Sequence, residues 1–100
     1  MRMETSNEAL AKAASDGDRA AFSQLLCSNY DRLFSLAFRL TGSRAEAEDL
    51  TQDVCLALPD KLKGFEGTAR FTTWLYRVVV NAAHDRRRRQ ATYARAASNC

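Results

Sequence analysis

The segment TARFTTWLYRVVVNAAHDRRRR, residues 68–89, carries the residue types best suited to bind nucleic acid. Cations neutralise phosphate, an exposed aromatic ring stacks on an unpaired base, and an amide side chain hydrogen-bonds a base edge. With helical spacing, such side chains fall on one stripe, formed by Arg70, Trp74, Arg77, Asn81, His84, Asp85 and Arg88. Periodicity alone leaves two interpretations open, a nucleic-acid surface and a solvated basic face.

The same segment has a second, apolar stripe at helical spacing, which is expected to face a core. Its members are Phe71, Leu75, Val78, Val79 and Ala82. Trp74 borders this stripe, so it can contribute to the core as well as to a binding surface. Asn81 has poor helix propensity for a mid-helix position, which favours a contact role for its amide.

A second group of candidate binding residues lies in the preceding helical segment. Asp49, Gln52, Asp53 and Leu56 are spaced i, i+3, i+4 and i+7, so they share one face. The opposite side is expected in the core and consists of Ala47, Leu50, Val54 and Leu58. Two carboxylates one turn apart repel each other, and a basic partner surface would relieve that repulsion. No His, Cys or third carboxylate shares the face, so neither a metal site nor acid–base catalysis is favoured.

The elements that position these residues are all helical, because the chain has one proline and no sustained alternation of β-branched residues. Helices are expected over residues 6–15, 18–40, 43–58 and 68–89. Ser43 and Glu46 form a capping box, and Gly42 ends the helix before it. Pro59 predicts that the third helix ends near Leu58. Residues 61–67 form a glycine-punctuated loop, and Thr68 is expected to cap the fourth helix.

Composition indicates one small globular domain. The chain has 100 residues and is 46% hydrophobic, too short for two sizeable cores. Neither a signal peptide nor a membrane-spanning segment is recognisable, so no membrane insertion is expected. The cysteines are odd in number and form no CxxC, which favours neither a disulfide framework nor a zinc site. A cytoplasmic location is predicted, with no metal or cofactor.

Charge is distributed unevenly along the chain. Residues 1–60 carry six Lys or Arg against ten Asp or Glu, a balance of −4. Residues 61–100 carry nine against two, a balance of +7. An acidic half and a basic half predict two partners of opposite charge.

Taken in order, three motifs resemble conserved region two of bacterial RNA polymerase sigma factors. They are Asp49-Leu50-Thr51-Gln52-Asp53, then Gly64-Phe65-Glu66-Gly67, then Phe71-Thr72-Thr73-Trp74-Leu75-Tyr76-Arg77 followed by Asn81 and Asp85. The short form is similar to the extracytoplasmic-function (ECF) group, and the match runs from about Ala21 to Arg89. Each motif is weak alone, but the ordered set is specific.

The resemblance implies a fold and two binding surfaces. The fold is an all-α, compact bundle of about four helices. Asp49, Gln52, Asp53 and Leu56 would bind the clamp helices of the polymerase β′ subunit. The loop and the last helix would capture the non-template strand of the promoter −10 element, with one base flipped into a protein pocket. The residues expected to bind this DNA are Lys63, Phe65, Arg70, Trp74, Arg77, Asn81 and Arg88.

The resemblance also sets the expected boundaries and partners. Residues 1–90 would form the region two domain and residues 91–100 a linker or a frayed helix end. Nothing after Arg89 supplies the helix-turn-helix domain that reads the −35 element, so a fragment or truncated product is expected. Its partners would be core polymerase, promoter DNA and an anti-sigma factor, and alone it would be a monomer.

Two other classes of protein account for part of the pattern. A general basic nucleic-acid-binding module explains the charge but not the acidic face around Asp53. A helical interaction domain, sequestered by an anti-sigma factor, explains both faces without DNA. An enzyme is not expected, because no phosphate loop or nucleophile–base pair is present.

Overall fold

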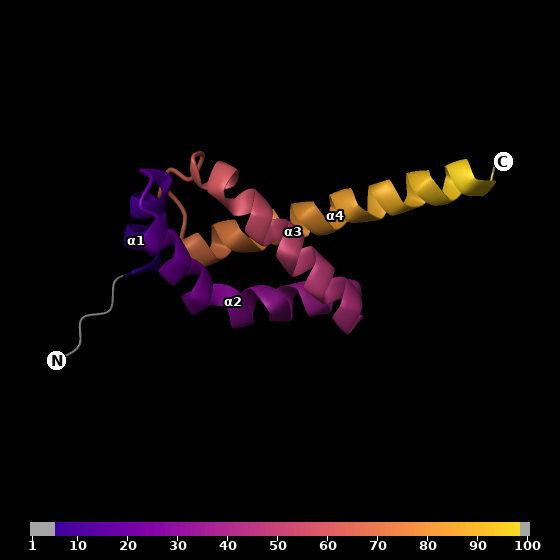
Figure 1. Ribbon diagram of the computed structural model, residues 1–100, viewed down its shortest axis with the longest axis horizontal. Helices are drawn as coiled ribbons and strands as arrows, with labels where there is room; N and C mark the ends of the chain where they lie inside the picture. The colour runs from indigo at the N-terminus through magenta and orange to yellow at the C-terminus, as the bar shows by residue number, and fades with distance from the viewer. Residues whose placement is uncertain (1–5, 99–100) are drawn as a thin grey trace.

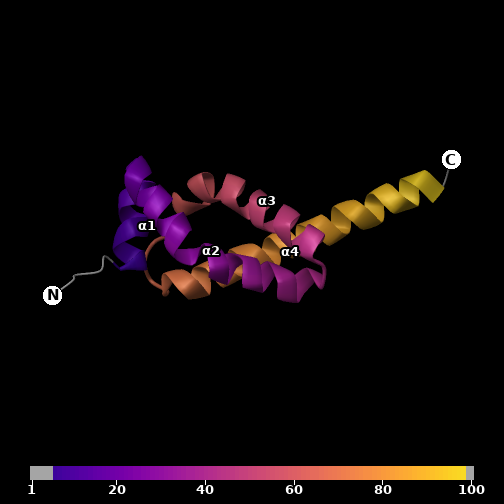
Figure 2. The same ribbon diagram turned by 60° about the horizontal axis from the view of Figure 1, so that its bottom comes forward.

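The computed structural model describes residues 6–98, and within that range the chain is α-helical with no strand (Figure 1). The helices are α1 (Asn7–Ser15), α2 (Arg19–Thr41), α3 (Arg44–Leu62) and α4 (Phe71–Ser98). The predicted all-α bundle is confirmed. The molecule is elongated, with extents of 61 × 24 × 22 Å, because α4 projects beyond the other helices in both views (Figures 1 and 2).

Short polar side chains define where three of the helices begin. Ser6, Asp18 and Ser43 occupy the N-cap positions, and each side-chain oxygen accepts a hydrogen bond from the backbone N–H three residues later. Gly42 ends α2 in the left-handed conformation, with φ of 73°, which glycine adopts at little cost. These starts and the end of α2 agree with the sequence-based prediction to within one residue.

The helix α3 continues through Pro59 to Leu62, so the predicted end near Leu58 is wrong. A proline inside a helix removes one hydrogen bond and crowds the preceding turn. Leu58 and Leu62 lie one turn apart on either side of Pro59 and are only 2% and 1% exposed. Burying a leucine stabilises the fold by about 1.5–3 kcal/mol, so continuing the helix to bury Leu62 offsets the local cost.

The helix α4 begins at Phe71 rather than just after Thr68, so the predicted cap is also wrong. Thr68 lies in an exposed bend of the loop formed by residues 63–70. The capping acceptor comes instead from α1, where Glu8 Oε2 accepts a hydrogen bond from the Phe71 N–H at 2.7 Å. A carboxylate also suits the positive end of the helix dipole. The donor and acceptor are 63 positions apart, so local sequence patterns cannot reveal this cap.

All four helices contribute to one hydrophobic core. Its buried apolar residues are Leu10, Ala11, Ala21, Leu25, Leu33, Ala37, Ala47, Leu50, Val54, Leu58, Leu62, Phe71, Leu75, Val78, Val79 and Ala83. Ala82, predicted to face the core, is half-buried, and the adjacent Ala83 is buried in its place. Burial on α4 stops soon after this point, since residues 87–97 are all exposed. None of the helices described is long and apolar enough to cross a membrane.

Candidate functional site

The predicted DNA-binding stripe occupies one flank of α4. Arg70, Arg77, Asn81 and Arg88 are exposed, and Trp74 is half-buried. The stripe extends from Arg70, in the loop before α4, to Arg88, which lies beyond Ala83, the last buried residue among residues 71–97 of the helix. A long, straight helix therefore presents cations, an aromatic edge and an amide in a line, as a surface for a polyanionic strand requires.

An aromatic cluster anchors the loop of residues 63–70 to the first turn of α4. The ring centroid of Phe65 lies 6.0 Å from that of Phe71 and 5.2 Å from that of Trp74, and the Phe71–Trp74 distance is 5.7 Å. Phe71 is fully buried, whereas Phe65 and Trp74 are only partly buried. Trp74 was expected to contribute to the core, to a binding surface, or to both. In the structure its ring packs on the core and part of it remains accessible.

Lys63, the remaining residue of the predicted DNA-binding set, follows the last turn of α3. Its Nζ lies 3.5 Å from a carboxylate oxygen of Asp60. Both side chains are well exposed, and an exposed ion pair of this kind contributes little to stability. Lys63 can therefore exchange this partner for a phosphate at small cost.

The acidic face predicted on α3 is present in the structure. Asp49, Gln52, Asp53 and Leu56 are all exposed, and Leu56 is 76% exposed. The opposite side of α3 is buried through the residues predicted for the core: Ala47, Leu50, Val54 and Leu58. An exposed leucine beside carboxylates and an amide is suited to contact with another protein.

An arginine of α4 bridges the two carboxylates of this face. Arg86 Nη2 donates a hydrogen bond to Asp49 Oδ2 at 3.3 Å, and its Nη1 lies 3.5 Å from Asp53 Oδ2. Arg89 Nη2 lies 3.8 Å from the same Asp53 oxygen. The Arg86 side chain is only 20% exposed, and its Nε is buried without a hydrogen-bond partner. The repulsion expected between the two carboxylates is thus relieved by the chain itself.

The inward-facing position of Arg86 on α4 could have been predicted from its spacing to the apolar residues before it, but it was not. Arg86 lies seven residues after the buried Val79 and three after the buried Ala83, which places it on the inner side of α4. Residues 86–89 are four consecutive arginines in the sequence. In a helix four consecutive residues point in four different directions, so a run in sequence is not a patch in space.

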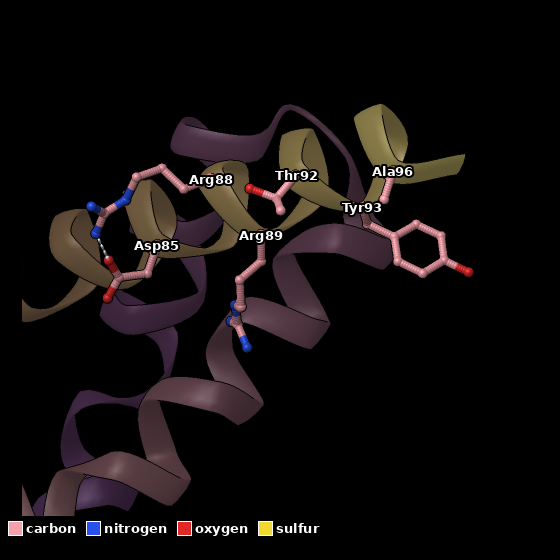
Figure 3. A pocket seen from close by; sticks show the side chains of 6 residues that line it. All are labelled: Asp85, Arg88, Arg89, Thr92, Tyr93 and Ala96. Carbon is pink, nitrogen blue, oxygen red and sulfur yellow. Dashed lines mark hydrogen bonds and ion pairs between the residues drawn. The ribbon is translucent and has the colours of Figure 1, made fainter. Parts of the chain in front are cut away.

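The other members of this run also have partners within the chain. Arg87 Nη2 donates to the backbone carbonyl of Leu40, near the end of α2, at 3.1 Å. Arg88 pairs with Asp85 on α4 itself. Figure 3 shows that pair on one side of a hollow of about 880 Å³, while Arg89 extends toward α3 and Tyr93 points outward. Within residues 6–98, Arg70 and Arg77 form no hydrogen bond or ion pair through their side chains.

Within residues 6–98 no three His, Cys, Asp or Glu residues come together as possible metal ligands. Burial raises the pKa of the Cys55 thiol, which keeps this thiol protonated near neutral pH and reduces its reactivity.

Known proteins of similar sequence and structure define the class of this domain. Residues 25–93 match the sigma-70 region 2 family. The ECF RNA polymerase sigma factor SigM of Mycobacterium tuberculosis is 43% identical over 89 residues, covering 88% of this chain and 45% of that protein. The ECF sigma factor SigW of Bacillus subtilis is 32% identical over 79 residues, covering 79% of this chain and 42% of that protein.

Structural similarity extends over nearly the whole domain. A solved structure of an engineered region 2 of sigmaE in complex with GTAAAA has a TM-score of 0.80 and 27% identity, and the match covers 91% of this chain and 95% of that one. The chain belongs to the sigma-70 region 2 family, in the form found in ECF sigma factors. It spans less than half the length of these two curated relatives.

Proposed function

We propose that this domain directs transcription initiation by binding core RNA polymerase through α3 and the promoter −10 element through α4. The match to a region 2 structure that contains the hexanucleotide GTAAAA is the observation that carries the DNA half of this proposal. One flank of α4, together with Arg70 just before the helix, offers exposed cations, a partly accessible aromatic ring and an amide on the same fold. The −10 element would be held as its single-stranded non-template strand.

The loop of residues 63–70 and the first turns of α4 would capture an unpaired base. Extruding a base from the duplex costs a few kcal/mol, and stacking on a protein ring returns about 1–3 kcal/mol. Phe65 and Trp74 supply partly exposed rings, and Asn81 supplies an amide two turns further along α4. Binding then traps the open promoter, so the protein melts DNA by selective binding without any covalent step.

The cations would hold the strand without reading its sequence. Arg70 and Arg77 have no partner within residues 6–98 to give up, whereas Lys63 and Arg88 would each exchange an exposed carboxylate for phosphate. Backbone contacts of this kind position a nucleic acid, and base contacts specify its sequence. Arginine and base-reading residues therefore have separable effects on binding.

The face formed by Asp49, Gln52, Asp53 and Leu56 would bind the β′ clamp helices of polymerase. Its exposed carboxylates and amide suit a basic or polar helical surface, and Leu56 would supply the apolar contact. An anti-sigma factor would inhibit the protein by covering this face or the α4 stripe. We infer a cytoplasmic factor that is monomeric alone and acts without a cofactor.

Open-complex formation by holoenzyme reconstituted from this protein and core polymerase tests the proposal. Promoters with single −10 substitutions are titrated at several salt concentrations. Asn81→Ala and Phe65→Ala should flatten the preference among the −10 sequences and leave the salt slope unchanged. Arg77→Ala should weaken all sequences alike and lower the slope by about 0.7, the value for one lost contact to a single strand.

Arg95→Ala is the matched control, because Arg95 is an exposed α4 arginine far from the loop and forms no ion pair within residues 6–98. It should leave both the promoter ranking and the salt slope at their wild-type values. If Asn81→Ala and Phe65→Ala retain the wild-type ranking of promoters, the loop and the stripe are structural and the proposed recognition is wrong.

A further inference from the structure

A second basic surface lies between α2 and α4. It is a groove of about 560 Å³ lined by Arg32, Ser35, Leu36, Arg39, Thr72, Thr73 and Tyr76. The helices α2 and α4 are in contact with each other, and the groove lies between them. None of these seven residues belongs to the DNA-binding set expected from the sequence or to the polymerase-binding face.

Among the residues that the structure describes, the groove is lined by two arginines and no Asp or Glu. Arg32 and Arg39 are exposed and form no hydrogen bond or ion pair within residues 6–98. The hollows near the end of α4 differ, because each contains an aspartate, Asp85 or Asp53, that pairs with an arginine. The α2–α4 groove is therefore positively charged without internal compensation, and an anionic ligand would not have to displace a carboxylate.

The other polar groups of the groove suit a phosphodiester backbone. Four hydroxyl-bearing residues, Ser35, Thr72, Thr73 and Tyr76, line it beside the two arginines. Ser, Thr, Tyr and Arg side chains all serve as phosphate contacts in protein–DNA interfaces. Arg32 and Arg39 are seven residues apart on one helix face, about 10 Å along its axis. Phosphates of one B-DNA strand recur every 3.4 Å or so along the axis, so the two arginines can reach phosphates about three nucleotides apart.

The groove faces away from the site proposed for the flipped base. Successive residues of a helix are rotated by about 100°, so Tyr76 points to nearly the opposite side of α4 from Trp74. Arg77 lies between these two directions. The aromatic cluster of Phe65, Phe71 and Trp74 lies on the far side, and Tyr76 is the single ring in the groove. This composition favours contact with a backbone over stacking of bases.

We propose that the α2–α4 groove binds the phosphodiester backbone of the duplex promoter DNA that adjoins the −10 element. This inference rests on the proposed function for its partner, promoter DNA, and adds a second site with a different role. The Trp74 side of α4 would hold the melted strand, while the groove would hold the neighbouring duplex through charge and hydroxyl contacts. The groove would strengthen promoter binding without contributing to sequence preference.

The test compares holoenzymes that carry Arg32→Ala/Arg39→Ala with a control pair, Arg19→Ala/Arg95→Ala. The control arginines are exposed and have no ion pair within residues 6–98, but they lie outside the groove. Affinity for duplex promoter DNA is measured from low to moderate salt, and affinity for a single-stranded −10 oligonucleotide is measured in parallel. Circular dichroism and core-polymerase binding confirm that each variant folds and assembles.

The groove variant should lower the salt slope for duplex DNA by about 1.8, because each duplex phosphate contact contributes about 0.9. At 0.15 M salt the same relation gives a loss of about fivefold in affinity per arginine. Binding to the single-stranded oligonucleotide and the ranking of −10 sequences should not change. Arg32→Lys/Arg39→Lys should retain most of the slope, because a lysine keeps the charge.

An unchanged slope for the groove variant, or a loss equal to that of the control pair, overturns the inference. Reduced binding to core polymerase also overturns it, since the groove would then be a protein contact. Asn81→Ala, measured on the same promoters, separates this inference from the proposed function. If Asn81→Ala alters the promoter ranking while the groove variant behaves as wild type, only the groove assignment fails.

Discussion

The bridge from Arg86 to Asp49 and Asp53 predicts that the two carboxylates are energetically coupled. Arg86 contacts both, at 3.3 and 3.5 Å. Removing one carboxylate, as in Asp49→Ala or Asp53→Ala, leaves the guanidinium one ionic partner on α3. Removing both leaves it with none, although its side chain is only 20% exposed. The double variant should therefore lose more stability than the two single variants together.

The magnitude follows from the burial of the arginine. Each single variant removes a partly exposed ion pair, which costs about 0.5–1 kcal/mol. The double variant also leaves a largely buried charged donor unsatisfied, at a cost of about 1–3 kcal/mol. We expect a coupling of about 1 kcal/mol or more between the two sites. For a domain of this size each 1 kcal/mol lowers Tm by about 4–8 °C, so the excess loss is measurable.

Urea unfolding, followed by far-ultraviolet circular dichroism, measures the free energy of unfolding of the wild type, both single variants and the double variant. Arg86→Met in the double-variant background should recover part of the loss, because an apolar side chain has no unsatisfied donors. Losses that add to within about 0.5 kcal/mol would show that the sites are independent. The bridge would then contribute nothing beyond two separate surface pairs, and the reasoning would be refuted.

Two further predictions concern the start of α4 and the polymerase face. Glu8→Ala should destabilise the fold by about 1–2 kcal/mol in urea unfolding, since it removes a helix cap, and should speed hydrogen exchange at the Phe71 amide; exchange at the wild-type rate would show that Glu8 does not cap α4. Gln52→Ala/Leu56→Ala should weaken binding to core polymerase while changing stability by less than about 0.5 kcal/mol, because both side chains are exposed and Gln52 forms no hydrogen bond within residues 6–98. Full affinity in the second variant would exclude this face from the polymerase interface.

The Arg86 bridge also changes how polymerase binding should be tested. From exposure alone, Asp53→Lys would be expected to alter stability by only about 0.5 kcal/mol. In the structure it would bring a third cation beside Arg86 and Arg89, so it should perturb the packing of α4 on α3. Loss of polymerase binding by this variant would combine two effects. Variants at Gln52 and Leu56 avoid that ambiguity because both side chains are exposed and neither takes part in the ion pairs of the bridge.

Local patterns in the sequence determined the all-α class, three of the helix starts and most of the buried faces of α3 and α4. Helical periodicity identifies buried faces directly, because side chains three or four residues apart share a side. Ser6, Asp18 and Ser43 act on N–H groups three residues away, so their effect is visible in a short segment. The motifs around Asp53, Phe65 and Trp74 indicated the sigma region two family, which the comparisons confirmed.

Tertiary packing decided the features in which distant residues act on one another. Burial of Leu62 carries α3 past Pro59, against the local preference for ending the helix. Glu8 caps a helix that begins 63 residues later. Arg86 is held inside the α3–α4 contact, whereas Arg32 and Arg39, beside α4, form no hydrogen bond or ion pair within residues 6–98. An arginine has the same charge in every sequence position, and only the folded chain determines whether a carboxylate, a carbonyl or open solvent faces it.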